Sequence, residues 1–121
     1  MPLDGSSFVL CVLTSRAGDA TALRVTADDL RASAHDSAPP IGLGTLLRAL
    51  WLDAHGDWDG AHGIVQDDES RDGAWVHAYL HRKEGDATNA AYWYDRAARS
   101  AATIPLDDEW RAIADTLLIG K

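Results

Sequence analysis

Residues 45–65 read TLLRALWLDAHGDWDGAHGIV, and residues 74–94 read AWVHAYLHRKEGDATNAAYWY. Aligned at an offset of 29 residues (74 − 45), the two segments share an alanine, then the pair Gly-Asp, then a second alanine. The shared positions are Ala49 and Ala78, Gly56-Asp57 and Gly85-Asp86, and Ala61 and Ala90. A glycine that ends one helix, followed by an aspartate that caps the next, is typical of a tight turn between two helices. The repetition predicts two similar helical hairpins stacked side by side, because neither can hide its apolar face alone.

Apolar residues recur at helical spacing through both copies of the repeat. The first helix is expected from Thr45 to Gly56, the second from Asp57 to the acidic turn at 67–69, the third from about Asp72 to Gly85, and the fourth from Asp86 or Thr88 to about Ala97. The third helix is expected to bury one face, made of Trp75, Val76, Tyr79 and Leu80. In the first helix, the residues equivalent to these are Leu46, Leu47, Leu50 and Trp51.

Two further helices are expected to flank the repeat. Thr26 and Asp29 fit a capping box before a short helix that ends near Ala34. A last helix is expected from about Pro105, and the acids at 107–109 suit the positive end of its dipole. The sequence therefore predicts an all-α domain over residues 26–121: two stacked antiparallel helical hairpins with a short N-terminal helix and a C-terminal capping helix. Residues 1–25 show no helical periodicity and are expected to form an arm, either a strand or disordered.

The composition limits the classes of partner. The chain has 121 residues, 19 acidic against 11 basic side chains, and a formal net charge of −8. Nucleic acid and anionic membranes would repel such a protein, so we expect neither as a partner, and a basic protein or peptide fits better. The single cysteine, Cys11, excludes an intramolecular disulfide and favours a cytoplasmic location. The longest apolar run, Phe8–Leu13, is far shorter than the roughly 20 residues that cross a bilayer.

The second copy of the repeat resembles a known class of helical repeat. Gly85-Asp86, Ala90, Tyr94 and Ala97 are similar to the turn and second helix of a tetratricopeptide or Sel1-like unit. The resemblance covers roughly residues 45–100, although its period of 29 residues differs from the tetratricopeptide period of about 34. It implies a non-enzymatic module that binds a protein or peptide. The stretch 50–98 also resembles a group of small, functionally uncharacterised bacterial proteins, which implies a bacterial source and no activity.

A histidine pattern on the third helix gives the candidate binding surface. His77, His81 and Glu84 share one helix face, which we expect to point away from the buried face, toward solvent or a partner. The repeat offset places Arg48, Leu52 and His55 on the equivalent face of the first helix. The leading hypothesis is therefore a partner-binding surface with six members: Arg48, Leu52, His55, His77, His81 and Glu84.

The alternative hypothesis assigns metal chemistry to the same face. Imidazole and carboxylate groups ligate zinc, so His55, His77, His81 and Glu84 would form a zinc site or the centre of a small metalloenzyme. The sequence lacks the His-Glu-x-x-His spacing that sets a general base beside zinc, which disfavours a hydrolase. A third hypothesis is self-association through exposed aromatic side chains and the N-terminal arm.

Other functional templates are absent from the sequence. There is no Gly-x-Ser-x-Gly nucleophile elbow, and Cys11 has no histidine in an element expected to fold against it. Gly42-Leu43-Gly44 lacks the third glycine of a dinucleotide loop. The acidic clusters at 67–69 and 107–109 lack the ligand spacing of an EF-hand and are interpreted as helix-capping and solubilising groups. The sequence therefore assigns no catalytic residue and no cofactor.

Overall fold

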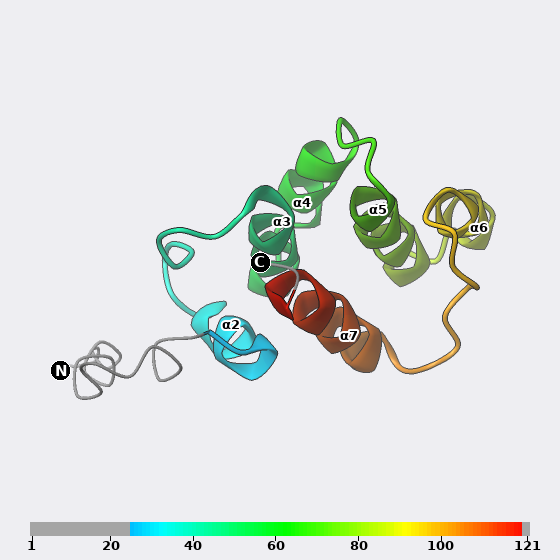
Figure 1. Cartoon of the computed structure of the whole chain (residues 1–121). Helices are drawn as coiled ribbons and strands as arrows, with labels where there is room; N and C mark the ends of the chain where they lie inside the picture. The colour runs from blue at the N-terminus through cyan, green and yellow to red at the C-terminus, as the bar shows by residue number, and fades with distance from the viewer. Residues whose placement is uncertain (1–24, 120–121) are drawn as a thin grey trace, which may run out of the picture.

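Six α-helices and no β-strand make up residues 25–119, the part of the chain that the computed structural model describes (Figure 1). The helices are α2 (Ala27–Ser33), α3 (Thr45–His55), α4 (Trp58–Val65), α5 (Arg71–Lys83), α6 (Ala87–Arg96) and α7 (Leu106–Ile119). The expectation of an all-α protein is confirmed, and each expected helix occurs close to its predicted bounds. The expected arm, residues 1–25, lies outside the described residues apart from Val25.

The two Gly-Asp pairs form equivalent turns. Gly56 and Gly85 have φ angles of 101° and 92°, the left-handed conformation that strains any residue with a side chain. The carboxylates of Asp57 and Asp86 each accept a hydrogen bond from the backbone N–H three residues ahead. The N–H of each aspartate donates to the carbonyl five residues back, at 2.8 Å and 2.9 Å respectively. The hydrogen bonding of the first turn therefore recurs at an offset of 29 residues (86 − 57), as the sequence predicts.

The short helix α2 begins at the predicted capping box. Thr26 Oγ1 accepts a hydrogen bond from the Asp29 N–H at 3.0 Å, and Asp29 Oδ2 accepts one from the Thr26 N–H at 3.1 Å. Leu30 is fully buried. Arg31 pairs with Asp107 at the start of α7, with 2.8 Å between Nη2 and Oδ1. This helix is thus fixed to the C-terminal helix by one buried side chain and one exposed ion pair.

Helix α5 is the central helix of the fold. It packs on α3, α4, α6 and α7, and Figure 1 shows it between α4 and α6 with α7 beside it. Every residue from 73 to 81 is buried. The most extensive contacts join α3 to α4 and α5 to α6, the two pairs that the Gly-Asp turns connect. Because α5 is enclosed by four neighbours, it has no broad solvent-facing side.

Helix α7 is held in place by two adjacent buried residues. Trp110 is fully buried and donates its indole N–H to a backbone carbonyl of α3 at 3.0 Å. The Glu109 carboxylate, 1% exposed, accepts hydrogen bonds from Trp75 Nε1 at 3.2 Å, Tyr94 Oη at 2.5 Å and Arg82 Nη1 at 2.8 Å. The interpretation of Glu109 as a solubilising surface acid was therefore wrong. Its carboxylate joins α7 to α5 and α6.

Ala98 occupies a backbone conformation that favours glycine. With a φ of 61°, it follows α6 much as Gly56 and Gly85 follow α3 and α5. Alanine in the left-handed region costs roughly 1–2 kcal/mol relative to glycine in the folded state. Glycine regains only part of this energy, because it loses more conformational freedom than alanine on folding.

We expect Ala98→Gly to raise the free energy of unfolding by about 0.5–1 kcal/mol in urea denaturation. Gly85→Ala is the matched control and should lower it by about 1 kcal/mol. Destabilisation by Ala98→Gly would contradict the assigned conformation.

Candidate metal centre

Three histidine side chains meet between α4 and α5. His62 is half-buried on α4, whereas His77 and His81, one turn apart on α5, are only 3% and 8% exposed. The Nε2 atoms of His62 and His77 form a hydrogen bond at 3.1 Å, in which one ring donates and the other accepts. One ring nitrogen from each of the three histidines lies within 4.8 Å of the other two. The cluster therefore offers three converging imidazole nitrogens.

Two tryptophan rings enclose this cluster. Trp93 of α6 stacks on His77, with 3.9 Å between ring centroids and 15° between the planes. Trp58 of α4 stacks on His62 at 4.9 Å and 8°. The Trp58 indole N–H also donates to the Leu80 carbonyl at 2.9 Å, which ties α4 to α5. These contacts set the orientation of two of the three imidazoles.

Glu84 sets the orientation of the third imidazole. Its Oε2 lies 2.7 Å from His81 Nδ1. A carboxylate oxygen accepts hydrogen bonds, so His81 Nδ1 donates this bond and Nε2 is the ring nitrogen that stays outside it. Histidines that bind metals commonly donate their other ring N–H to a carboxylate in this way. Glu84 therefore prepares His81 as a ligand through Nε2.

Burial favours the neutral forms of His62 and His77. Desolvation, together with nearby His62 and His81, lowers the pKa of His77 to about 4. Desolvation and His81 also lower the pKa of His62, while the carboxylates of Glu84 and Asp59 partly oppose that shift. Since the neutral imidazole is the form that binds metal, His62 and His77 are ready to act as ligands at pH 7.

His77 also carries an unsatisfied polar atom. Within the described residues, its Nδ1 is buried and has no hydrogen-bond partner. Leaving such an atom unpaired costs about 1–3 kcal/mol, and native proteins contain few examples. An apolar side chain of similar size would avoid this cost. The presence of histidine here indicates a role other than packing.

The spacing of the three nitrogens suits a tetrahedral metal ion. Zinc binds imidazole at about 2.0–2.1 Å, which places two ligand nitrogens of a tetrahedron about 3.4 Å apart. The pair from His62 and His77 lies close to this separation at 3.1 Å, and the whole set lies within 4.8 Å. The residues therefore fit a three-histidine zinc site.

The structure corrects the predicted orientation of His77 and His81. Both were expected to face solvent, whereas both are buried, and His77 contacts side chains of α4 and α6. The expectation was wrong because it gave α5 a single buried face, and α5 packs against helices all round. Ala74 and Ala78, only 3% and 0% exposed, lie in the same buried stretch. Alanines near histidines in the sequence are therefore a signal that neighbouring helices approach closely at this face.

Four of the six residues predicted for the partner surface do reach solvent at least in part. Arg48, His55 and Glu84 are exposed, and Leu52 is half-buried. With His77 and His81 removed from the surface, a partner on this side would have to be bound by these four residues.

His55 does not belong to the cluster, and His62 takes its place. His55 Nδ1 lies 2.8 Å from the Ala34 carbonyl oxygen, and the ring stacks on Trp51 with centroids 4.5 Å apart. It therefore serves the contact between α2 and α3. Sequence reasoning missed His62, whose only signal is its position one turn after Trp58 on an apolar face of α4. The predicted zinc set is corrected to three histidine ligands, with Glu84 as the hydrogen-bond partner of His81.

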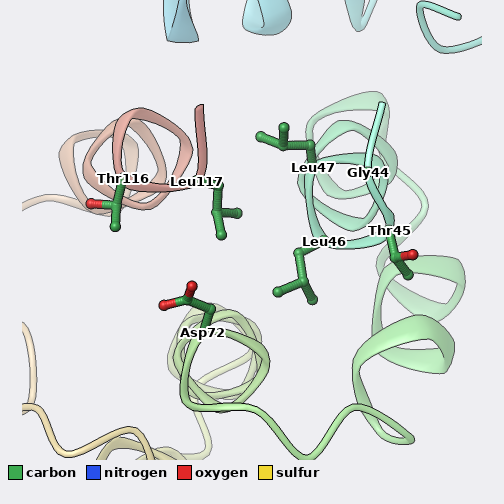
Figure 2. A pocket seen from close by; sticks show the side chains of 7 residues that line it. All are labelled: Gly44, Thr45, Leu46, Leu47, Asp72, Thr116 and Leu117. Carbon is green, nitrogen blue, oxygen red and sulfur yellow. The ribbon is translucent and has the colours of Figure 1, made fainter. Parts of the chain in front are cut away.

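A separate pocket of about 260 Å³ opens where the start of α3, the start of α5 and the end of α7 meet. Figure 2 shows Leu46 of α3 and Leu117 of α7 pointing toward the same space as Asp72 of α5. Asp72 is the only ionisable side chain in its lining, and none of the three clustered histidines lines it. The pocket and the histidine cluster are therefore distinct features of the molecule.

Over residues 25–119, the fold and the cluster together define an all-helical structure with a histidine-rich centre between α4 and α5. In comparisons with protein-family models, curated proteins and solved structures, nothing matched this chain. No helix within residues 25–119 is both long enough and apolar enough to cross a membrane.

Proposed function

We propose that this protein binds a first-row transition metal ion, best matched by zinc, through His62, His77 and His81. The observation that carries the proposal is the convergence of three imidazoles, two of them almost fully buried, with one nitrogen of each within 4.8 Å of the others. Imidazole ligands suit zinc, copper, iron and nickel. A tetrahedral site with three protein nitrogens matches zinc in geometry.

The packing around the cluster supports a metal site over an ordinary aromatic core. The buried Nδ1 of His77 has no hydrogen-bond partner within the described residues, so hydrogen bonding through Nδ1 does not account for a histidine at this position. The hydrogen bond from His81 to Glu84 gives one histidine the carboxylate partner that is typical of metal ligands. Trp58 and Trp93 brace the other two rings. The cluster thus combines converging ligands with groups that hold them in place.

We further propose that the scaffold of this site is a tetratricopeptide-like repeat. The matching φ angles and hydrogen bonds of the turns at Gly56 and Gly85 support it. In such a repeat, His62 belongs to the second helix of the first hairpin, and the other two histidines belong to the first helix of the second. The metal would then join two neighbouring repeats.

Binding of a protein or peptide stays a prediction. It applies to Arg48, Leu52, His55 and Glu84, the part of the predicted surface that reaches solvent. The burial of the two α5 histidines removes two of the six residues predicted for that surface. The metal site is the stronger proposal because its ligands are already assembled.

Zinc titration of the chelator-treated full chain tests the proposal. We expect one zinc ion per chain to bind with a dissociation constant of about 1 μM or lower in calorimetry. His62→Ala and His77→Ala should each weaken binding by more than about 100-fold, since loss of an outer hydrogen-bond partner alone costs 10–100-fold.

His55→Ala is the matched control for this titration. It removes a histidine that lies outside the cluster, so the zinc affinity should stay unchanged. Circular dichroism of each variant establishes that the helices are retained. Unaltered zinc binding by His62→Ala would contradict the three-histidine site, and a loss on His55→Ala would restore the ligand set predicted from the sequence.

A further inference from the structure

Helix α4, which supplies His62, has an unusually weak helical sequence. It is only 8 residues long and contains Gly60 and Gly63. A helix of this length is only marginally stable without tertiary contacts. Each glycine in its interior lowers the equilibrium constant for helix formation by roughly fivefold relative to alanine. The proposed ligand His62 therefore lies on a short helix that contains two glycines.

The two glycines of α4 differ in what the structure demands of them. A Cβ at Gly60 would lie 2.4 Å from an Asp57 carboxylate oxygen, so a side chain there would displace the capping carboxylate from its present position. A Cβ at Gly63 would meet nothing within 4 Å, and the φ of Gly63 lies outside the left-handed region. The structure therefore gives no packing or backbone reason for glycine directly after His62. Its remaining effect is to loosen α4.

The contact of α4 with α5 is the weaker of its two main contacts. Helix α4 packs more extensively on α3, where Ala61 and Val65 belong to the fully buried core. Toward α5, its polar contacts are the Trp58 bond to the Leu80 carbonyl and the approach of His62 to His77. A metal ion bound by all three histidines would add bonds at this weaker contact.

We infer that zinc bound at the proposed site holds α4 against α5, so that α4 opens less often when the metal is bound. We call this zinc-dependent contact the clamp. The inference rests on the proposed function, since it requires a metal ion shared by His62 on α4 and the histidines of α5. Local opening of α4 withdraws His62 and releases the ion. Gly63 lowers the free energy of this local opening in the metal-free protein. Zinc binding therefore has a larger effect on how often α4 opens.

Amide hydrogen exchange of the full chain, with and without zinc, tests the clamp. The amides of Ala61 and Gln66, which donate to carbonyls at 57 and 62, report opening of α4. At a free zinc concentration 100 times the dissociation constant, their exchange should slow by about 100-fold. Amides of α7 that exchange by local opening, which leaves the site intact, should not slow. The protection of α4 should disappear in His77→Ala, which leaves the sequence of α4 intact.

A second variant probes the same opening without zinc. Gly63→Ala should slow metal-free exchange of the α4 amides by up to about fivefold, because alanine favours the helix. Ala32→Gly, at an exposed position of α2, is the matched control and should leave α4 exchange unchanged.

The outcomes separate the clamp from the metal site. Zinc binding with selective protection of α4 supports the clamp. Zinc binding without a change in α4 exchange, or with equal slowing of α4 and α7, overturns the clamp and leaves the metal site standing. If calorimetry detects no zinc binding, both proposals are overturned.

Discussion

Glu109→Ala is expected to lower the free energy of unfolding by about 3–5 kcal/mol. The Glu109 carboxylate is 1% exposed and accepts hydrogen bonds from Trp75, Tyr94 and Arg82. Alanine would leave a buried indole N–H and a buried phenol without an acceptor, and the Arg82 guanidinium without its counter-charge. Because domains of this size are stable by only about 5–15 kcal/mol, the variant should unfold at a much lower urea concentration.

Asp108→Ala is the matched control for this prediction. Asp108 is the preceding residue in the same first turn of α7, but it is exposed. Its loss should cost less than about 1 kcal/mol, the usual value of an exposed charge near a helix end. Urea denaturation followed by circular dichroism measures the stability of both variants. Equal losses for the two variants would contradict the role assigned to Glu109.

The metal-free protein is expected to lose about 2 kcal/mol of stability through His77 between pH 7 and pH 5. The pKa of His77 is lowered by desolvation to about 4 in the folded state, against an ordinary value of 6.5 in the unfolded chain. Between these values the unfolded chain binds the proton and the folded protein does not. Stability is therefore full above pH 6.5 and falls as the pH decreases toward 4. His62, whose pKa is also lowered, contributes in the same direction.

Urea denaturation in the presence of a chelator, at pH 7 and at pH 5, measures this loss. His77→Phe removes the titrating group and retains a ring that can stack on Trp93. The variant should lose about 2 kcal/mol less than the unmodified protein over the same interval. His35→Ala, at an exposed site outside the cluster, should behave like the unmodified protein. If His77→Phe shows the same pH dependence as the unmodified protein, His77 is not the group responsible.

The sequence by itself determined the positions of the helices and their turns. Thr26, Asp57 and Asp86 cap helices as predicted, and Gly56 and Gly85 end them. These features could be predicted because a cap or a left-handed glycine depends on groups within about five residues along the chain. The buried face of α5 that includes Trp75 and Tyr79 followed from apolar spacing for a similar reason.

Only the tertiary structure decided which polar side chains meet. Helical spacing identifies one apolar side of α5, but it does not reveal that α4 and α6 cover the side that carries His77. The same limit applies to His62 and to Glu109, which local patterns present as ordinary polar residues. Their burial depends on helices brought together from distant parts of the chain. Desolvation and close approach arise only from that packing, and they turn three separate histidines into one candidate metal site.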